Sequence, residues 1–491
     1  MKKRLTALGL AVLLVLSLFG CATKPKKKDP IQEFIDNKKG GNSEFVGFGK
    51  EDEITKDPLT ICMDVEYVQD PLAEVDVILN EFLSTLDQSG GLTDVVIEYV
   101  PKHGADREGM MDRIRVEIMS GGGPDVFIVN CGGTALVGQD HVQPLFPFPE
   151  KVMESGIFLP LDTYMENNTQ FAEWDKFTKP VMAAGRNDEG QQLIPLTYTL
   201  PLLCYGQADV EDFPATESTT WMDIVNDPAL SELARPMYDC FAMLLSDGEY
   251  IPASTFGHVE MIFGDLADYT EEELLLTEEE LYGRVKEIFA LWEQTKEIAP
   301  DGVEKYPYAM TCLGSQLQAN ASLLPKESFS EENIELFSGN EPLTMIPIYS
   351  DDGGVTASIM SFAAVNRNTQ RPEEAYTVID LLMRDHVQRK YMLYSELLTG
   401  IGVGISMHED LMQQDTTVGG RGQWYMTDQR YQQVCEIRDQ ITAANFRTEL
   451  DMEIYNMLID CLIVELENGT DEDLKAVIHK HFETMQRMVR E

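Results

Sequence analysis

The chain has 491 residues, with 38 Lys and Arg against 84 Asp and Glu, and a formal net charge of -46. A composition this acidic lacks the basic face that phosphate binding requires, so nucleic acid is excluded as a partner. The stretch 58–491 is also too long for one hydrophobic core, which predicts two lobes.

The first 21 residues, MKKRLTALGLAVLLVLSLFGC, predict the compartment. A basic start at 2–4 precedes an apolar stretch, 5–19, that is too short for an ordinary membrane span, and Cys21 follows where it ends. This pattern resembles a bacterial lipoprotein signal, which implies that Cys21 is lipidated with diacylglycerol and palmitate and anchors the mature chain. The expected location is the extracellular face of the cell membrane, or its periplasmic face in a Gram-negative cell. An ordinary signal peptide and an uncleaved anchor are the alternatives.

Residues 22–57 are predicted to be a flexible tether. They are polar, show no periodicity, and cannot bury enough apolar area to order themselves. Lys24 and the run 26–28 are expected to lie against anionic lipid headgroups.

From residue 58 the sequence alternates between strand-like and helical patterns. Short apolar runs at 59–63 and 95–100 predict two strands, and between them Asp70 and Pro71 begin a helical stripe that ends at Gly90. A second stripe follows, and then a third apolar run at 126–129. The order β-α-β-α-β predicts an α/β fold with a parallel sheet covered by helices.

The second stripe ends in three glycines. Met111, Ile114 and Ile118 recur at helical spacing, and the run 121–123 followed by Pro124 predicts a helix stop. A phosphate-binding loop needs glycines after a strand and before a helix, with a Lys behind them. These glycines lie after a helix and before a strand, so a helix stop is the better interpretation.

Six segments in this order carry a resemblance to a known family: SGGGPDVF at 120–127, LPLDTYM at 159–165, LIPLTYTLPLLCYG at 193–206, TTWMDI at 219–224, SIMSFAAVNRNTQRPEEAYTVIDLLM at 358–383 and LLTGIGVGIS at 397–406. Together they resemble the extracellular solute-binding proteins, family 1, of bacterial ABC importers. The nearest group is the carbohydrate type that includes maltose-binding proteins. The resemblance extends from about Pro58 to Glu491.

The resemblance implies a two-lobe periplasmic-binding-protein-like fold of type II, with the lobes joined by crossing hinge segments. Lobe one is expected at 58–197 and 361–413, and lobe two at 198–360 and 414–491. The crossings are expected near 195–201, 358–364 and 409–417. The patterns agree independently in two places: 357–365 is strand-like, and Thr470 with Asp473 forms a capping box for a last helix.

The resemblance also implies where a ligand touches the chain. In the family the ligand groups follow the first and third strands of lobe one, or come from the crossings and from aromatic residues of lobe two. The matching positions are Asp64, Glu66, Asn130, Thr134, Tyr198, Trp424 and Tyr425. Loop capping, hydration or packing against a lobe is the alternative at each position. The segment 337–349 lacks a Trp that many relatives carry, which argues against a maltose-like site.

Nothing in the sequence predicts an enzyme. HExxH, GxSxG and SxxK patterns are absent, and His479 and His481, two apart on a predicted helix, are expected on the surface. Asp64 and Glu66 could serve as a glycosidase pair, but 84 acidic residues make such a pair certain by chance. No catalytic residue, metal or cofactor is therefore expected. The acidic stretch 270–281 is interpreted as a solvated helical face.

Cysteine spacing gives no framework. Apart from Cys21, seven cysteines are scattered without a CxxC pair: Cys62, Cys131, Cys204, Cys240, Cys312, Cys435 and Cys461. An odd number in this pattern indicates neither a zinc site nor a complete set of disulfides, although an exported protein could still form one disulfide. Most are expected to be small buried apolar residues.

These observations favour a lipid-anchored substrate-binding protein of an ABC transporter. It is expected to be a monomer that captures a small solute, a mono- or oligosaccharide, by hinge closure and delivers it to membrane permease subunits. One alternative is a surface interaction or sensor protein with the same fold. The other is a glycoside-active lipoprotein.

Overall fold

The computed structural model describes residues 47–49, 54–64, 75–101, 105–131, 143–167, 172–206, 219–226, 263–296, 343–351, 353–385, 387–388, 405–408, 432 and 435–490. All of them belong to one compact unit, Gly47–Glu491. Within these residues no helix is long and apolar enough to cross a membrane.

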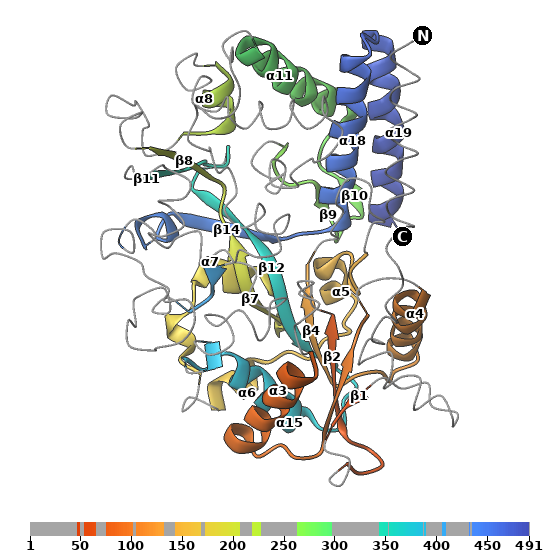
Figure 1. Cartoon of the computed structure of the whole chain (residues 1–491), viewed down its shortest axis with the longest axis vertical. Helices are drawn as coiled ribbons and strands as arrows, with labels where there is room; N and C mark the ends of the chain where they lie inside the picture. Colours follow the sequence, from red (N-terminus) through yellow and green to blue (C-terminus); the bar gives the residue numbers. More distant parts are fainter. Residues whose placement is uncertain are drawn as a thin grey trace, which may run out of the picture. The chain divides into compact units, whose positions relative to one another are not determined.

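A mixed sheet forms the centre of the described part (Figure 1). Its strand order is β1-β3-β2-β4-β12-β7-β13, and β14 pairs with β12 off this path. The bounds are β1 Gly47–Phe48, β2 Leu59–Asp64, β3 Val95–Tyr99, β4 Val126–Asn130, β7 Leu193–Thr199, β12 Val355–Val365, β13 Ile405–Ser406 and β14 Ile441–Phe446. Parallel and antiparallel neighbours are combined, as a chain that enters the sheet from several distant segments requires.

The predicted β-α-β-α-β unit is present. β2 pairs in parallel with β3 and with β4, and the connecting helices are α3, Val75–Gly90, and α4, Ala105–Met119. The strands are buried along almost their whole length, which explains their unbroken apolar runs.

The glycine run ends α4, as predicted. Met111, Ile114 and Ile118 are buried on one face of the helix, and the chain then turns through Gly121 and Gly123, whose φ angles are 81° and 92°. A Cβ on Gly123 would lie 3.1 Å from the Ile118 side chain. A side chain is therefore opposed both by backbone conformation and by space at this turn.

Two strands leave the central sheet together. β7 runs antiparallel to β12, and the chain continues from β7 into β8, Leu202–Gly206, which pairs with β11, Leu343–Pro347. The amide of Ile348 donates to the carbonyl of Pro201 at 2.9 Å, so the β7–β8 and β11–β12 connections lie side by side. The β7–β8 connection falls at the end of the expected crossing 195–201, whereas the expected crossing 358–364 lies inside β12 of the central sheet. The third, 409–417, lies outside the described residues. The crossings and the lobe bounds stay predictions.

A helical cluster forms the C-terminal part of the chain. α18, Glu449–Leu466, packs against α19, Asp471–Arg490, and α11, Glu278–Lys296, contributes to the same core. Thr470 and Asp473 form the predicted capping box: the Thr470 amide donates to the Asp473 carboxylate at 2.8 Å, and the Asp473 amide donates to the Thr470 hydroxyl at 3.2 Å.

The prediction that His481 lies on the surface is wrong. Its side chain is 4% exposed, and its ring nitrogens lie 2.7 Å from the Glu453 carboxylate and 3.0 Å from that of Asp460. Both carboxylates come from α18, where helix packing brings them to the ring. Burial lowers the pKa of His481, but hydrogen bonds and charge from the two carboxylates outweigh it, so the pKa is raised overall.

The remaining described elements are shorter or cover the sheet: α5 Pro149–Glu154, α6 Asp162–Asn167, a 3-10 helix at Trp174–Lys176, α7 Lys179–Ala184, β5 Arg186–Asn187, β6 Gly190–Gln191, α8 Trp221–Asn226, β9 Ala267–Asp268, β10 Glu273–Leu274 and α15 Pro372–Leu382. Of these, α5 and the segment around β9 contribute residues to the pocket described below.

Two predicted stretches differ in the structure. Gly47 and Phe48 lie within the predicted tether, yet they form β1, because β3 offers its free edge for backbone pairing. The acidic stretch 270–281 is not one helix, since it contains a turn and β10 before α11 begins at Glu278. Cys62, Cys131 and Cys461 are buried free thiols, as expected, and Cys435 is free and partly exposed.

Candidate functional site

Asp64 ends β2 in a buried ion pair. Its Oδ1 and Oδ2 accept from Arg107 at 2.6 and 2.9 Å, and Oδ2 also accepts from the Leu145 amide at 2.8 Å. The Arg107 guanidinium donates further to the carbonyls of Pro101 and Gln143. Both oxygens of Asp64 thus have partners within the protein, and the side chain is 7% exposed. In this structure Asp64 holds the loop after β4 against α4.

Asn130 and Tyr198 are the other predicted ligand residues within the described part. Asn130 ends β4 and is partly exposed, and it pairs with Ser361 of β12. Tyr198 is fully buried in β7, between β12 and β13. Asn130 therefore lies at a strand end that solvent reaches, whereas Tyr198 belongs to the sheet interior.

Five other predicted positions lie outside the described residues: Cys21, Glu66, Thr134, Trp424 and Tyr425.

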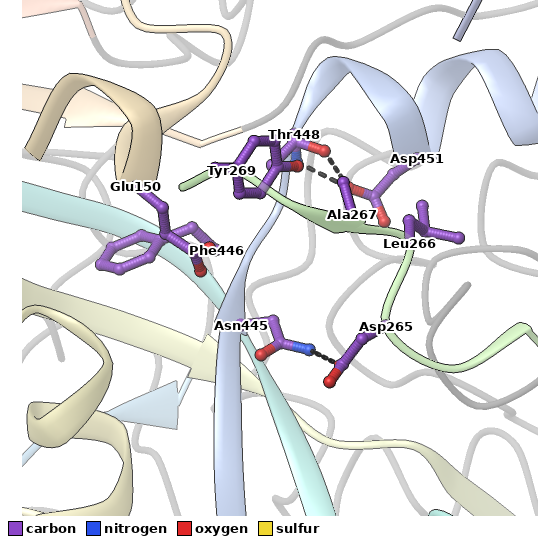
Figure 2. Close-up of a pocket in the computed structure, with 9 residues that line it drawn as sticks. All are labelled: Glu150, Asp265, Leu266, Ala267, Tyr269, Asn445, Phe446, Thr448 and Asp451. Carbon is purple, nitrogen blue, oxygen red and sulfur yellow. Dashed lines mark hydrogen bonds between the residues drawn. The ribbon is translucent and has the colours of Figure 1, made fainter. Parts of the chain in front are cut away.

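A pocket of about 110 Å³ opens beside the end of β14 (Figure 2). Because about 10–15 Å³ suffices for one water molecule, this volume accommodates a small solute or a headgroup. It is lined by Glu150, Asp265, Leu266, Ala267, Tyr269, Asn445, Phe446, Thr448 and Asp451. These residues come from α5, from the segment around β9, and from the passage between β14 and α18.

The pocket lies near the carboxyl end of β4. Cys131 directly follows that strand, and its amide donates to the Met360 carbonyl of β12 at 2.8 Å. Phe446 of β14 pairs with the adjacent Ile359 of β12, so the two strand ends lie close together. In open α/β sheets the carboxyl ends of parallel strands form the ligand crevice. The pocket is therefore at the edge of the sheet where a ligand is expected.

Local sequence fixes the position of the pocket residues. Thr448 caps α18: its amide and hydroxyl donate to the Asp451 carboxylate at 2.6 and 3.0 Å, and its hydroxyl accepts from the Leu450 amide. Asn445 at the end of β14 donates its amide to the Asp265 carboxylate at 2.8 Å (Figure 2). The passage from β14 to α18 is thus held in place by its own caps and by a bond to the β9 segment.

Burial raises the pKa values of two pocket carboxyls. Burial is the main reason why the pKa of Glu150 rises to about 7, and the charges of Asp265 and Asp451 add to it, while a hydrogen bond from the Phe446 amide lowers it. Burial also raises the pKa of Asp451, opposed by the charge of Arg447 and the cap bonds. Glu150 is therefore close to half-ionised at neutral pH.

Aromatic rings complete the wall. The Tyr269 ring lies 5.8 Å from that of Phe148, and the Phe446 ring makes an edge contact with Phe362 at 5.6 Å between centroids. Tyr269 is partly exposed and presents apolar surface beside the carboxylates and the Asn445 carboxamide, whereas Phe446 is 2% exposed and closes the wall from the core side. Flat apolar surface beside hydrogen-bonding groups is suited to a ligand with both an apolar face and polar substituents.

No cluster of three or more Asp, Glu, His or Cys that could hold a metal ion occurs within the described ranges.

The sequence alone did not identify this pocket. Glu150 follows Pro149 in a six-residue helix, and Asp265 lies in a stretch without clear periodicity, so neither carried a functional signal. The spacing of Thr448 and Asp451 is a readable capping signal, but it indicates a helix start rather than a site.

No protein-family model matches the sequence, and no curated protein matches it. Solved structures do match. An extracellular solute-binding protein family 1 from Alicyclobacillus acidocaldarius subsp. acidocaldarius DSM 446 superposes with a TM-score of 0.52 at 13% identity, covering 89% of this chain and 100% of its own. The bacterial solute receptor AcbH, reported to have an exclusive preference for β-D-galactopyranose, gives a TM-score of 0.50 at 10% identity, covering 90% and 100%. The chain has the two-lobe fold of these periplasmic-binding-protein-like structures, as its sequence predicted.

Proposed function

We propose that this chain is the substrate-binding component of an ABC importer and that the pocket beside β14 holds its solute. The observation that carries the proposal is the composition of this pocket. Carboxylates, a carboxamide and two aromatic rings line a cavity near the carboxyl end of β4. Such a wall recognises a small polyhydroxylated solute, whose hydroxyls donate to carboxylates and whose apolar face packs on a ring.

Solute capture is proposed to proceed by closure of the two lobes. The β7–β8 and β11–β12 connections run side by side out of the central sheet, as segments that bend together would. Ligand that contacts both lobes only when they are closed shifts the equilibrium to the closed form. Delivery to the permease would follow from recognition of that form.

We propose that the protein binds its solute without cleaving it. Asp64, the carboxylate that the sequence suggested for glycoside cleavage, accepts hydrogen bonds on both oxygens from Arg107 and from the Leu145 amide. An acid or nucleophile in such a role needs a free oxygen directed at the substrate.

Lipid anchoring through Cys21 completes the proposal. A lipidated chain partitions into the detergent phase of Triton X-114 and into cell membranes, whereas Cys21→Ser is expected in the aqueous phase and the culture medium. Equal partitioning of the two proteins would contradict the anchor and leave the binding role open.

Thermal unfolding tests the binding role. The full chain in mild detergent is followed by circular dichroism with a panel of mono- and oligosaccharides, amino acids and peptides. A ligand at about 100 times its Kd adds roughly 2.7 kcal/mol to the free energy of unfolding, which visibly raises Tm. A rise with one class of sugar supports the proposal, and a protein that unfolds cooperatively with no rise for any solute contradicts it.

A further inference from the structure

We propose that the pocket takes a solute that carries a protonated amine, and that the carboxylates of Glu150 and Asp265 hold its ammonium group. This inference rests on the proposed function, because it assumes that the pocket holds the captured solute. It adds the chemical class of the ligand.

Carboxylates are the only charged groups among the described residues that line the pocket. Three of these nine residues are carboxylates, and none is Lys, Arg or His. Asp451 has its own compensation, since the Thr448 cap bonds and the charge of Arg447 favour its ionised form. Within the described part of the chain, the other two carboxylates, Glu150 and Asp265, form no ion pair with a Lys, Arg or His.

Glu150 and Asp265 each accept one bond from a neutral group. Glu150 accepts from the Phe446 amide, and Asp265 accepts from Asn445. Their charges repel each other, and Asp265 is the charge that acts most strongly on Glu150. A neutral hydroxyl can bond to either carboxylate but cannot relieve this repulsion, whereas one ammonium group has three donors and a full positive charge.

The shape of the site favours an organic cation over a metal ion. The carboxylates of the described pocket do not form a cluster that could hold a metal. An amine reaches separate carboxylates through separate N–H bonds, and the partly exposed ring of Tyr269 attracts a cation or packs on the carbon frame that bears it. The net charge of -46 also raises the local concentration of a cationic solute.

The ionisation of Glu150 gives the inference a second signature. With its pKa at about 7 in the free protein, Glu150 must lose its proton to pair with an ammonium group. Affinity is therefore highest at pH 8 and above, and it falls as pH decreases through 7. Between pH 8 and pH 6 the loss is about tenfold if the bound ammonium keeps Glu150 ionised throughout. A neutral ligand that uses Glu150 only as one acceptor shows a smaller dependence.

Matched amine and hydroxyl pairs test the inference by isothermal titration calorimetry on the full chain. The probes are 6-amino-6-deoxy-D-glucose with D-glucose, 6-amino-6-deoxy-D-galactose with D-galactose, and putrescine with 1,4-butanediol. Primary alkylamines stay protonated from pH 6 to pH 8, so only the protein titrates. At least one amine is expected to bind ten or more times more tightly than its hydroxyl partner at pH 8, with about tenfold weaker binding at pH 6.

Two variants locate the effect. Glu150→Gln keeps the shape of the side chain and removes its charge, so it should abolish both the amine preference and its pH dependence. Glu154→Gln removes the same charge from the exposed end of the same helix. The charge of Glu154 raises the pKa of Glu150 less than burial, Asp265 and Asp451 do, so the amine preference and the fall in affinity at low pH should both persist.

The outcomes separate the two proposals. The amine inference is overturned if each hydroxyl compound binds at least as tightly as its amine partner and Glu150→Gln does not change the ratio of their affinities. Solute binding then remains supported. An amine preference that survives Glu150→Gln also overturns it. Absence of binding by every probe overturns the inference, and the solute panel then decides separately whether the binding role stands.

Discussion

Replacing Asp64 by Ala should destabilise the protein strongly while leaving the pocket beside β14 intact. The substitution leaves the Arg107 guanidinium buried without its carboxylate and removes the acceptor of the Leu145 amide. Breaking a buried ion pair from one side costs about 3–5 kcal/mol. For a cooperative unit of roughly 150–250 residues, each kcal/mol lowers Tm by about 2–4 °C, so the expected fall is roughly 6–20 °C.

Thermal and urea unfolding, with solute titration on the same samples, check this prediction. Glu173→Ala is the matched control, because it breaks an exposed ion pair with Lys176 that contributes at most about 1 kcal/mol. The double variant Asp64→Leu with Arg107→Met should recover most of the loss, since no charge then remains buried. An Asp64→Ala protein with unchanged Tm that no longer binds solute would refute the reasoning and restore Asp64 as a ligand residue.

Three further predictions concern stability. The free energy of unfolding of the wild type should exceed that of His481→Gln below about pH 6.5, and this difference should be lost as pH rises through the raised pKa of His481. Urea unfolding midpoints of both proteins from pH 6 to 9 measure the difference, and a difference that grows with pH contradicts the prediction. Gly109→Ala, inside α4 with open space around it, should stabilise by about 0.5–1 kcal/mol, whereas Gly185→Ala should destabilise, because its Cβ would lie 2.0 Å from the Leu193 carbonyl oxygen. Asn366→Ala removes two hydrogen bonds to the carbonyls of Gly122 and Pro124 in the glycine turn, and should lower the free energy of unfolding by about 1–3 kcal/mol, measured by urea unfolding. A loss smaller than that caused by the same substitution at an exposed Asn would contradict the prediction.

Local patterns predicted the segment from β2 to β4, residues 59–130, well. The stripe through Ile114, the glycines after it and the run from Val126 specify a helix, a stop and a buried strand by short-range physics alone. The cap formed by Thr470 is equally local. Each of these signals depends on residues within a few positions of one another, which is why the sequence suffices.

Long-range partners were not predictable in this way. The sequence shows Asp64 at a strand end, but the 43-residue separation to Arg107 carries no pattern that announces an ion pair. His481 was misplaced because its environment is supplied by another helix, through Glu453 and Asp460. A titratable side chain changes from surface group to buried partner according to what packs against it.

The pocket was not predictable for the same reason, because its residues come from distant parts of the sequence. Glu150, Asp265 and Asn445 are separated by more than a hundred residues along the chain and meet only through the fold. In a chain with 84 acidic residues, no single carboxylate is conspicuous. The predicted site residues came instead from a family resemblance, and only Asp64, Asn130 and Tyr198 among them lie within the described part.

Equilibrium dialysis of the full chain against its best solute, with mass spectrometry of the solute afterwards, tests the central claim most directly. The account predicts saturable binding of one solute molecule per chain and recovery of that solute chemically unchanged. Recovery of a cleaved or modified solute, or failure of every solute to saturate a cooperatively folded protein, would contradict it.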